Sequence, residues 1–251
     1  MEHLHAVVTG ASSGIGYETV RSLTRDHAMR VTAVARRRDR LDELAAQTGC
    51  AVIQADITSQ DDVDRLAREV DGPVHVLVNN AGGAIGWDTV AESSLEAWSA
   101  QYELNVVGTV RVTQALLPAL TASGRGDVVV VTSTAGHEPY EQGAGYVAAK
   151  HAAVAMTRTL RLELTGTGVR VIEIAPGMVR TEEFSLNRFA GDDRAADAVY
   201  EGIEPLTAHD IADAITWAVT RPHHVNIDQL VIRPREQAGA AKTVRRPSNT
   251  P

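Results

Sequence analysis

The chain has 251 residues, which is long enough to bury a full core, and one α/β domain is the simplest organisation for this length. Its formal net charge of -8 at pH 7 argues against a general binder of nucleic acid or of membrane surfaces. The one cysteine, Cys50, excludes an internal disulfide, and we expect a buried thiol in a reducing compartment.

No apolar run approaches the ~20 residues that a membrane-spanning helix needs. The first predicted strand begins close to Met1, which leaves no room for a signal peptide. We therefore expect a cytoplasmic protein.

Short apolar runs alternate with segments of helical periodicity, a pattern that predicts βαβ units and a parallel sheet. The predicted strands are Leu4–Thr9, Arg30–Ala35, Ala51–Ala55, Val74–Asn79, Asp127–Thr132, Val169–Ala175 and Gln229–Ile232. Helices are predicted at 14–27, 38–48, 60–70, 95–120, 144–164 and 207–219. With no repeat and no linker, residues 1–235 are expected to form one domain. Residues 236–251 are expected to be a flexible tail.

The first predicted strand runs into Thr9-Gly10-Ala11-Ser12-Ser13-Gly14-Ile15-Gly16, a glycine-rich turn that opens a helix. A strand, such a turn and a helix N-terminus form the context of a dinucleotide site. Gly10 permits the tight turn, Gly14 lets the backbone approach a pyrophosphate, and Gly16 lets the helix pack on the strand. The phosphates then meet the free N–H groups of the helix.

The second predicted strand ends in Ala35-Arg36-Arg37-Arg38. NAD sites usually place an acid here for the ribose hydroxyls, whereas guanidinium groups suit a 2′-phosphate. The arginines therefore favour NADP, although a solvated charge run that opens the next helix has the same composition.

Polar residues follow the next two strands and interrupt one helix. Asp56-Ile57 is placed to accept a hydrogen bond from an adenine amino group, and Asn80 to face the cofactor ribose. Asn105 lies inside a helical segment, where its propensity is poor, so a partner is expected. A buried capping role is the alternative for Asn105.

Ser133 ends an apolar strand, and Tyr146 and Lys150 lie four residues apart on one helix face. An ammonium group beside a phenol favours the phenolate and would lower the pKa of Tyr146 from about 10. Tyr146 then becomes a usable general acid/base. A helix surface pair is the bland alternative.

After the sixth strand, Pro176-Gly177 breaks the pattern, and residues 177–206 carry no strong element. An irregular stretch of this length inside a domain is usually functional. We expect a substrate loop, residues 177–206, over the carboxyl ends of the strands.

Taken together, these motifs resemble the short-chain dehydrogenase/reductase family over residues 4 to 235. The resemblance rests on Thr9-Gly10 with Gly14-Ile15-Gly16, Asn79-Asn80-Ala81-Gly82, Asn105, Ser133, Tyr146 with Lys150, and Pro176-Gly177. It implies a single-domain, Rossmann-like, doubly wound parallel sheet of seven strands with helices on both faces, in a homo-oligomer, either tetramer or dimer.

The resemblance also implies roles for these residues. Tyr146 exchanges the proton with the substrate oxygen, Ser133 orients that oxygen, and Lys150 lowers the Tyr146 pKa and leads to a water relay anchored by Asn105. No metal site is predicted. The expected NADP-binding residues are Gly10, Ser12, Ser13, Gly14, Ile15, Arg36, Arg37, Asp56, Ile57, Asn80, Tyr146, Lys150, Pro176, Gly177, Val179 and Thr181.

A narrower resemblance, in Thr181–Asp193 and Pro222–Ile227, is to NADP-dependent 3-hydroxy acid dehydrogenases, which include serine 3-dehydrogenases. It implies a small substrate such as serine, allo-threonine or 3-hydroxyisobutyrate. Arg188 or Arg180 would hold its carboxylate, Arg188 being preferred unless it pairs with Asp192 or Asp193. His137 is a further substrate candidate. Reduction of a larger aldehyde or ketone, or a catalytically silent NADP-binding sensor, are the alternatives.

Overall fold

The computed structural model describes residues 4–240 and 242–245. Its centre is a seven-stranded sheet in the order β3-β2-β1-β4-β5-β6-β9, and every neighbouring pair is parallel. This confirms the predicted fold class. The strands are β1 His5–Thr9, β2 Arg30–Ala35, β3 Ala51–Gln54, β4 Val76–Asn79, β5 Gly126–Val131, β6 Val169–Pro176 and β9 Gln229–Ile232.

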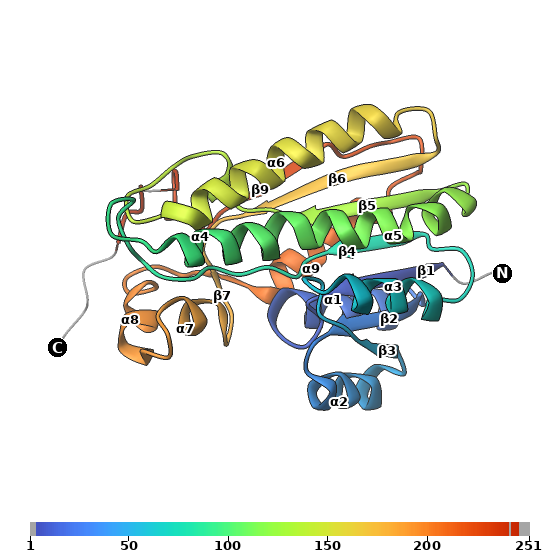
Figure 1. Cartoon of the computed structure of the whole chain (residues 1–251), viewed down its shortest axis with the longest axis horizontal. Helices are drawn as coiled ribbons and strands as arrows, with labels where there is room; N and C mark the ends of the chain where they lie inside the picture. The colour runs from blue at the N-terminus through green and yellow to red at the C-terminus, as the bar shows by residue number, and fades with distance from the viewer. Residues whose placement is uncertain (1–3, 241, 246–251) are drawn as a thin grey trace.

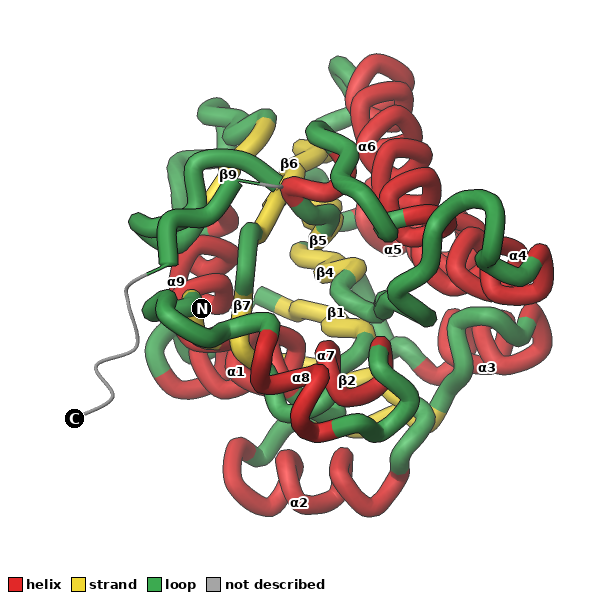
Figure 2. The backbone as a smooth tube through the Cα atoms, turned by 90° about the vertical axis from the view of Figure 1, so that its left-hand side faces the viewer, coloured by secondary structure: helices red, strands yellow, loops and turns green. Residues whose placement is uncertain are grey.

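The central strands are buried on both faces because helices cover the sheet from both sides (Figures 1 and 2). Every residue of β1, β5 and β6 is buried, which explains why apolar residues make up most of each of these strands. The helices α1, α2 and α9 cover one face, and α3, α4, α5 and α6 cover the other. Their bounds are α1 Gly14–Arg25, α2 Arg38–Thr48, α3 Gln60–Glu69, α4 Leu95–Tyr102, α5 Gly108–Ala122, α6 Ala144–Leu164 and α9 Ala208–Val219.

The strand order reverses between β1 and β4. The helices that follow these two strands leave on opposite faces, which opens a crevice beyond their carboxyl ends. The candidate catalytic and binding residues converge there. Within the described residues, no helix combines the length and the apolar composition needed to cross a bilayer.

The single helix predicted at 95–120 is interrupted by a π-helical turn, Glu103–Val107, between α4 and α5. Asn105, in this turn, donates hydrogen bonds through Nδ2 to the carbonyls of Gln101 and Gly83. A π-turn accommodates an extra residue in a helix and is often found at functional sites. The polar side chain that is poor in a regular helix therefore has the partners that were predicted.

The substrate loop, residues 177–206, is not irregular as predicted. It contains β7 Val179–Arg180, α7 Phe184–Arg188, α8 Asp193–Ala198 and the start of β8 Leu206–Thr207, which pairs with β7. Both helices lie beyond the carboxyl ends of the sheet strands (Figures 1 and 2). They are too short to show a periodic pattern in the sequence, which is why the prediction missed them.

The prediction of a flexible tail is wrong for its described residues, 236–240 and 242–245. Gln237 is buried and accepts a hydrogen bond from the Met178 backbone. Glu138 accepts one from the Ala240 backbone, and Gln237 bridges to Thr243. The rest of the predicted tail lies outside the described residues. Small polar residues indicated a frayed end, but here they pack against the substrate loop.

Candidate active site

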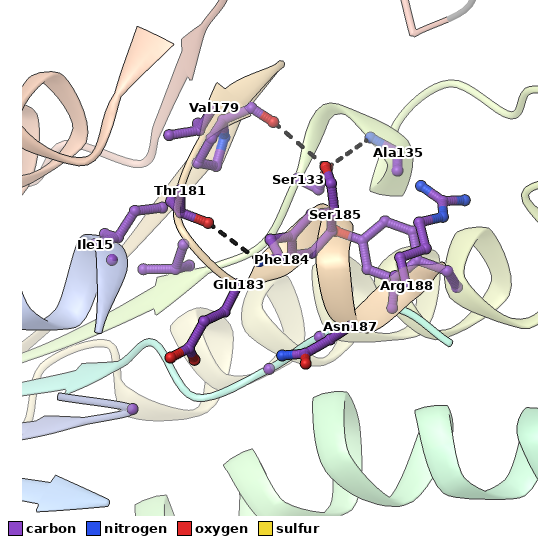
Figure 3. Close-up of a pocket in the computed structure, with 18 of the residues that line it drawn as sticks. Ile15, Ser133, Ala135, Val179, Thr181, Glu183, Phe184, Ser185, Asn187 and Arg188 are labelled. Atoms are coloured by element: carbon purple, nitrogen blue, oxygen red, sulfur yellow. Dashed lines mark hydrogen bonds between the residues drawn. The ribbon is translucent and has the colours of Figure 1, made fainter. Parts of the chain in front are cut away.

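A cavity of about 1360 Å³ opens at the carboxyl ends of the strands, under the substrate loop. Its walls come from the glycine-rich turn, the ends of β2 to β6, the head of α6 and the substrate loop (Figure 3). Among the predicted site residues, those that line it are Gly10, Ser12, Ser13, Gly14, Ile15, Arg36, Arg37, Asp56, Ile57, Asn80, Ser133, Tyr146, Lys150, Pro176, Gly177, Val179, Thr181 and Arg188.

The glycine-rich turn has the geometry that a dinucleotide needs. Gly10 and Gly14 have φ of +67° and +55°, a region that residues with a side chain rarely adopt. A Cβ on Gly16 would lie 2.4 Å from the Gly10 carbonyl oxygen, so only glycine lets α1 approach the turn. Ser13, at the N-cap of α1, makes no side-chain capping bond, which leaves the helix N-terminus available for an anion. These residues fit a dinucleotide.

Asn80 holds the glycine-rich turn in place. Its Nδ2 donates to the carbonyls of Thr9 and Gly10, and its backbone N–H donates to Thr9 Oγ1. Asp56 also lines the cavity, and its Oδ1 accepts from the backbone and the hydroxyl of Thr58. Both residues line the cavity.

The two arginines after β2 differ in environment. Arg36 is exposed and lies 4.0 Å from Asp56 Oδ2. Arg37 is half-buried, and its Nη1 and Nη2 donate to the two carboxylate oxygens of Glu183 at 2.5 and 2.9 Å. The pKa of Arg37 is raised above its ordinary value, mainly by this bond. Glu183 comes from the substrate loop, so the pair joins that loop to the cofactor side of the cavity.

Ser133 and Tyr146 lie at the inner end of the cavity. Ser133 Oγ accepts from the Ala135 backbone at 3.1 Å and lies 3.4 Å from the Pro176 carbonyl oxygen. Tyr146 is buried, with the Phe184 ring packed edge-on against it at 5.8 Å. The short 3₁₀ turn after Ser133 and the first turn of α6 thus bring both hydroxyls to one point.

The pKa of Tyr146 is raised, not lowered as predicted. Burial raises it most, because a phenolate loses hydration here, and Tyr140 raises it further. A hydrogen bond with Ser133 and the charge of Arg188 act in the opposite direction. Lys150 Nζ lies 5.8 Å from the centroid of the Tyr146 ring and donates to the Val131 carbonyl instead. Tyr146 is therefore a phenol, ready to donate a proton.

Lys150 is buried on α6, one turn after Tyr146. Burial lowers the pKa of its ammonium group to about 8. The Val131 carbonyl is the hydrogen-bond acceptor that holds Nζ, at 3.2 Å. With this pKa, Lys150 still carries an ammonium group at pH 7, and that group is held at the Val131 carbonyl.

Asn105 does not line the cavity, but it braces the loop behind Lys150. Its Oδ1 accepts from the Gly83 backbone N–H, and its Nδ2 donates to the Gly83 carbonyl. A Cβ on Gly82 would lie 2.7 Å from Asn105 Oδ1 and 3.4 Å from Lys150 Nζ. The glycine therefore lets the amide and the amine approach each other. Asn105 therefore has the buried structural role that was the alternative prediction for this residue.

Arg188 is a buried cation in the wall of the cavity. It is 8% exposed, and its guanidinium carbon lies 4.2, 5.6 and 5.5 Å from the ring centroids of Trp87, Tyr140 and Tyr146. Its Nη2 donates to the Tyr140 hydroxyl and its Nε to the Gly86 carbonyl. Among the described residues it has no ion-pair partner. The alternative pairing with Asp192 is wrong, because Asp192 caps α8 instead.

Arg180 does not reach the cavity. Its side chain is 57% exposed, and Nη2 pairs with Asp197 at 2.6 Å. Of the two arginines considered for a substrate carboxylate, the structure brings only Arg188 next to Tyr146.

The prediction that His137 contacts substrate is wrong. Its Nε2 lies 2.6 Å from Glu173 Oε1 and 2.8 Å from Gln229 Nε2, so the ring is held between β6 and β9. Glu173 is fully buried and also accepts from the hydroxyl of Thr132, the residue before Ser133. His137 is near the active site in sequence, but the 3₁₀ turn directs it away from the cavity.

Several lining residues were missed by sequence reasoning. Aromatic rings from three separate segments gather around Arg188, and only the tertiary fold shows that they meet. The tail residues were missed because their composition suggested disorder. The missed residues are Trp87, Tyr140, Glu183, Phe184, Phe189, Tyr200, Gln237, Thr243 and Arg245.

Comparisons with known proteins agree with this geometry. A family model described as short chain dehydrogenase matches residues 4–188. An uncharacterized oxidoreductase of Mycobacterium tuberculosis is 56% identical over 242 residues, which cover 96% of this chain and 95% of that protein. An NADP-dependent 3-hydroxy acid dehydrogenase of Salmonella typhi is 36% identical over 245 residues, covering 96% and 98%.

Among solved structures, the closed form of a serine dehydrogenase complexed with NADP⁺ superposes with a TM-score of 0.91 at 35% identity. The match covers 97% of this chain and the whole of that one.

Proposed function

Because the chain belongs to the short-chain dehydrogenase family, we propose that it transfers hydride between NADP and the 3-hydroxyl of a small 3-hydroxy acid. The chain is an NADP-dependent oxidoreductase, as its relatives' names and the NADP⁺ complex of its structural neighbour indicate. NADP supplies the hydride acceptor or donor. The choice of substrate is the proposal, and it rests on residues of the cavity.

Two hydroxyls handle the substrate oxygen in this proposal. Ser133 donates a hydrogen bond that orients the oxygen and stabilises charge as it develops. Tyr146 gives its proton to that oxygen when a carbonyl is reduced, and takes it back when an alcohol is oxidised. The raised pKa of Tyr146 favours the protonated phenol that reduction needs. Arg188 opposes this rise, so it acts on Tyr146 as well as on the substrate.

The buried, unpaired guanidinium of Arg188 is the observation that carries the substrate class. A charge that has left water without an anionic partner is unfavourable, and a bound carboxylate would supply that partner. The ring of Tyr146 lies beside Arg188, so an acid held there would present a carbon close to its carboxylate to the catalytic hydroxyls. A short hydroxy acid fits this separation.

The test compares Arg188→Ala with wild type on NADP and a panel of L-serine, D-serine, allo-threonine and 3-hydroxyisobutyrate. We expect the KM for the acid that is oxidised to rise by about 10- to 100-fold, because a buried charge-assisted bond is lost. For an uncharged secondary alcohol, the rate should change far less. Arg180→Ala, which removes an exposed arginine of the same loop, is the matched control.

An unchanged KM for acidic substrates in Arg188→Ala would exclude the carboxylate clamp. Activity confined to bulky aldehydes and ketones would support the second candidate, a reductase of larger carbonyl compounds. One feature favours that candidate: the cavity is large, and its lining also includes Val199, Thr243 and Arg245.

A catalytically silent sensor is disfavoured because Ser133, Tyr146 and Lys150 lie together in the cavity. Tyr146→Phe distinguishes an enzyme from a sensor, since it removes the proton donor and leaves the glycine-rich turn intact. Loss of NADPH oxidation with unchanged NADPH binding is the result for an enzyme.

We also propose a homo-oligomer, a tetramer or a dimer, in the cytoplasm. The supporting observation is that large apolar side chains are exposed on α6, α9 and β9, at Leu162, Trp217 and Val231. Light scattering on the purified protein measures the oligomeric state.

A further inference from the structure

Glu183 occupies a set of donors that is built for an anion. Arg37 holds both of its carboxylate oxygens, and the Ser13 hydroxyl donates to Oε2 at 2.9 Å. The Ser12 hydroxyl lies beside this set, where it accepts a hydrogen bond from Arg37 Nη2 at 2.9 Å. Burial raises the pKa of Glu183, but the bonds from Arg37 and Ser13 outweigh it and the pKa is lowered. The carboxylate is held as an anion.

The donors around Glu183 are those that the 2′-phosphate of NADP needs, if the cofactor lies along the glycine-rich turn as proposed above. Arg37 ends the loop after β2, where the adenine ribose of a dinucleotide lies, and the two serines belong to the turn itself. A guanidinium fork binds one carboxylate or one phosphate through the same two N–H groups. The carboxylate and the phosphate therefore exclude each other.

We propose that Glu183 is a cofactor-specificity residue, which competes with the 2′-phosphate of NADP for Arg37 and Ser13. In the cofactor-free protein it stands in for that phosphate. NADP binds by displacing it, whereas NAD has no group that takes its place.

The displacement also frees the substrate loop. Glu183 is the N-cap of α7, and the neighbouring Thr181 packs on the glycine-rich turn, where a Cβ on Gly14 would lie 3.2 Å from Thr181 Cγ2. Figure 3 shows Glu183 and Arg188 at opposite ends of α7, pointing away from each other. The bond between Glu183 and Arg37 thus holds the loop against the cofactor side of the cavity.

The test measures the binding of NADPH and NADH by fluorescence titration, without substrate, in Glu183→Gln and wild type. Glutamine keeps the size of the side chain and removes the competing charge. We expect the Kd for NADPH to fall about three- to tenfold, a modest factor because the pair is partly exposed, with less than a twofold change for NADH. Glu182→Gln removes a charge from the exposed neighbouring residue, which acts on Arg37 more weakly than Glu183 does, so it should change the Kd for NADPH far less.

An unchanged or raised Kd for NADPH in Glu183→Gln would overturn the proposal. Equal tightening of NADPH and NADH would also overturn it, because the carboxylate would then close the loop without competing with phosphate. Arg37→Ala tests the placement of the phosphate itself and should weaken NADPH but not NADH. Because no substrate is present, these outcomes are independent of which hydroxy acid the enzyme oxidises.

Hydrogen exchange gives a second readout. Adenosine 2′,5′-bisphosphate should speed amide exchange in residues 177–206 of the wild-type protein, whereas adenosine 5′-monophosphate should not. Protection of the loop by both nucleotides would contradict the displacement of Glu183.

Discussion

At the scale of single residues, Lys150 stands out as a charge-bearing group in a place that suits an apolar one. It is buried, and its pKa is lowered from 10.5 to about 8. Below pH 8 the folded protein must hold an ammonium group that would be better hydrated in the unfolded chain. Stability at neutral pH is therefore reduced for the sake of the site.

We predict that Lys150→Met raises the free energy of unfolding by about 1 to 3 kcal/mol at pH 7 and abolishes turnover. Methionine fills the same space without the charge and gives up only the bond to the Val131 carbonyl. Between pH 8 and pH 10 the unfolded wild-type chain binds more protons than the folded one, so wild-type stability should rise with pH. Urea denaturation across this range measures both effects.

In the variant this rise with pH should disappear. A variant less stable than wild type at pH 7 would show that the Val131 bond outweighs the burial of the charge.

Sequence reasoning could group the candidate catalytic residues because each belongs to a short motif with a fixed local geometry. Ser133, Tyr146 and Lys150 line one cavity, and Tyr146 and Lys150 lie one helical turn apart as their spacing predicted. It failed for the pKa of Tyr146, because burial depends on what packs around the ring. Sequence reasoning placed His137 at the substrate because it is close to Ser133 in the chain. The 3₁₀ turn between them, which the sequence does not reveal, directs the His137 side chain away from the cavity.

At the scale of elements, the strands could be predicted almost to the residue. Buried parallel strands are continuous apolar runs, and glycine or polar residues end them sharply. The π-turn at Glu103–Val107 could not be predicted, since one extra residue leaves the apolar period nearly unchanged. The elements of the substrate loop and the folded tail depend on tertiary contacts and carry no local signal.

The packed tail leads to a prediction of its own. Gln237 Oε1 accepts from the Met178 backbone at the start of the substrate loop. Gln237→Ala leaves this N–H without its partner, which should lower stability by about 1 kcal/mol and raise the KM for substrate severalfold. Steady-state kinetics and thermal unfolding measure the two effects.

Lys242→Ala is the control for this experiment, since it changes a tail residue whose side chain is exposed. Identical kinetics for wild type and Gln237→Ala would mean that the tail supports the fold but not the loop.

At the scale of the whole molecule, the two ends of the sheet carry different polar features. The cavity lies at the carboxyl ends, and a buried polar cluster lies at the amino ends. There, His5 Nε2 lies 2.9 Å from Thr32 Oγ1, and Arg30 Nη2 lies 2.8 Å from His5 Nδ1. Burial, with the charge of Arg30, lowers the pKa of His5 to about 4. A neutral imidazole is therefore part of the folded state.

We predict that this cluster makes the protein sensitive to acid. Between pH 8 and pH 5 the unfolded chain protonates His5 and the folded chain does not, so the free energy of unfolding should fall by about 2 kcal/mol from this group. His5→Gln removes that part of the pH dependence. Denaturation curves at both pH values measure it, and equal acid sensitivity in both proteins would rule out His5 as the cause.

Helix α7 gives the cavity a mechanical property of its own. Four residues separate Glu183, which contacts Arg37, from Arg188, which contacts Tyr146. A helix this short moves as a rigid unit, so a shift at one end also moves the other end. If the binding of one ligand shifts α7, the free energy of that shift changes the affinity for the second ligand. Such coupling is reciprocal. Cofactor and substrate would then alter each other's affinity by the same factor.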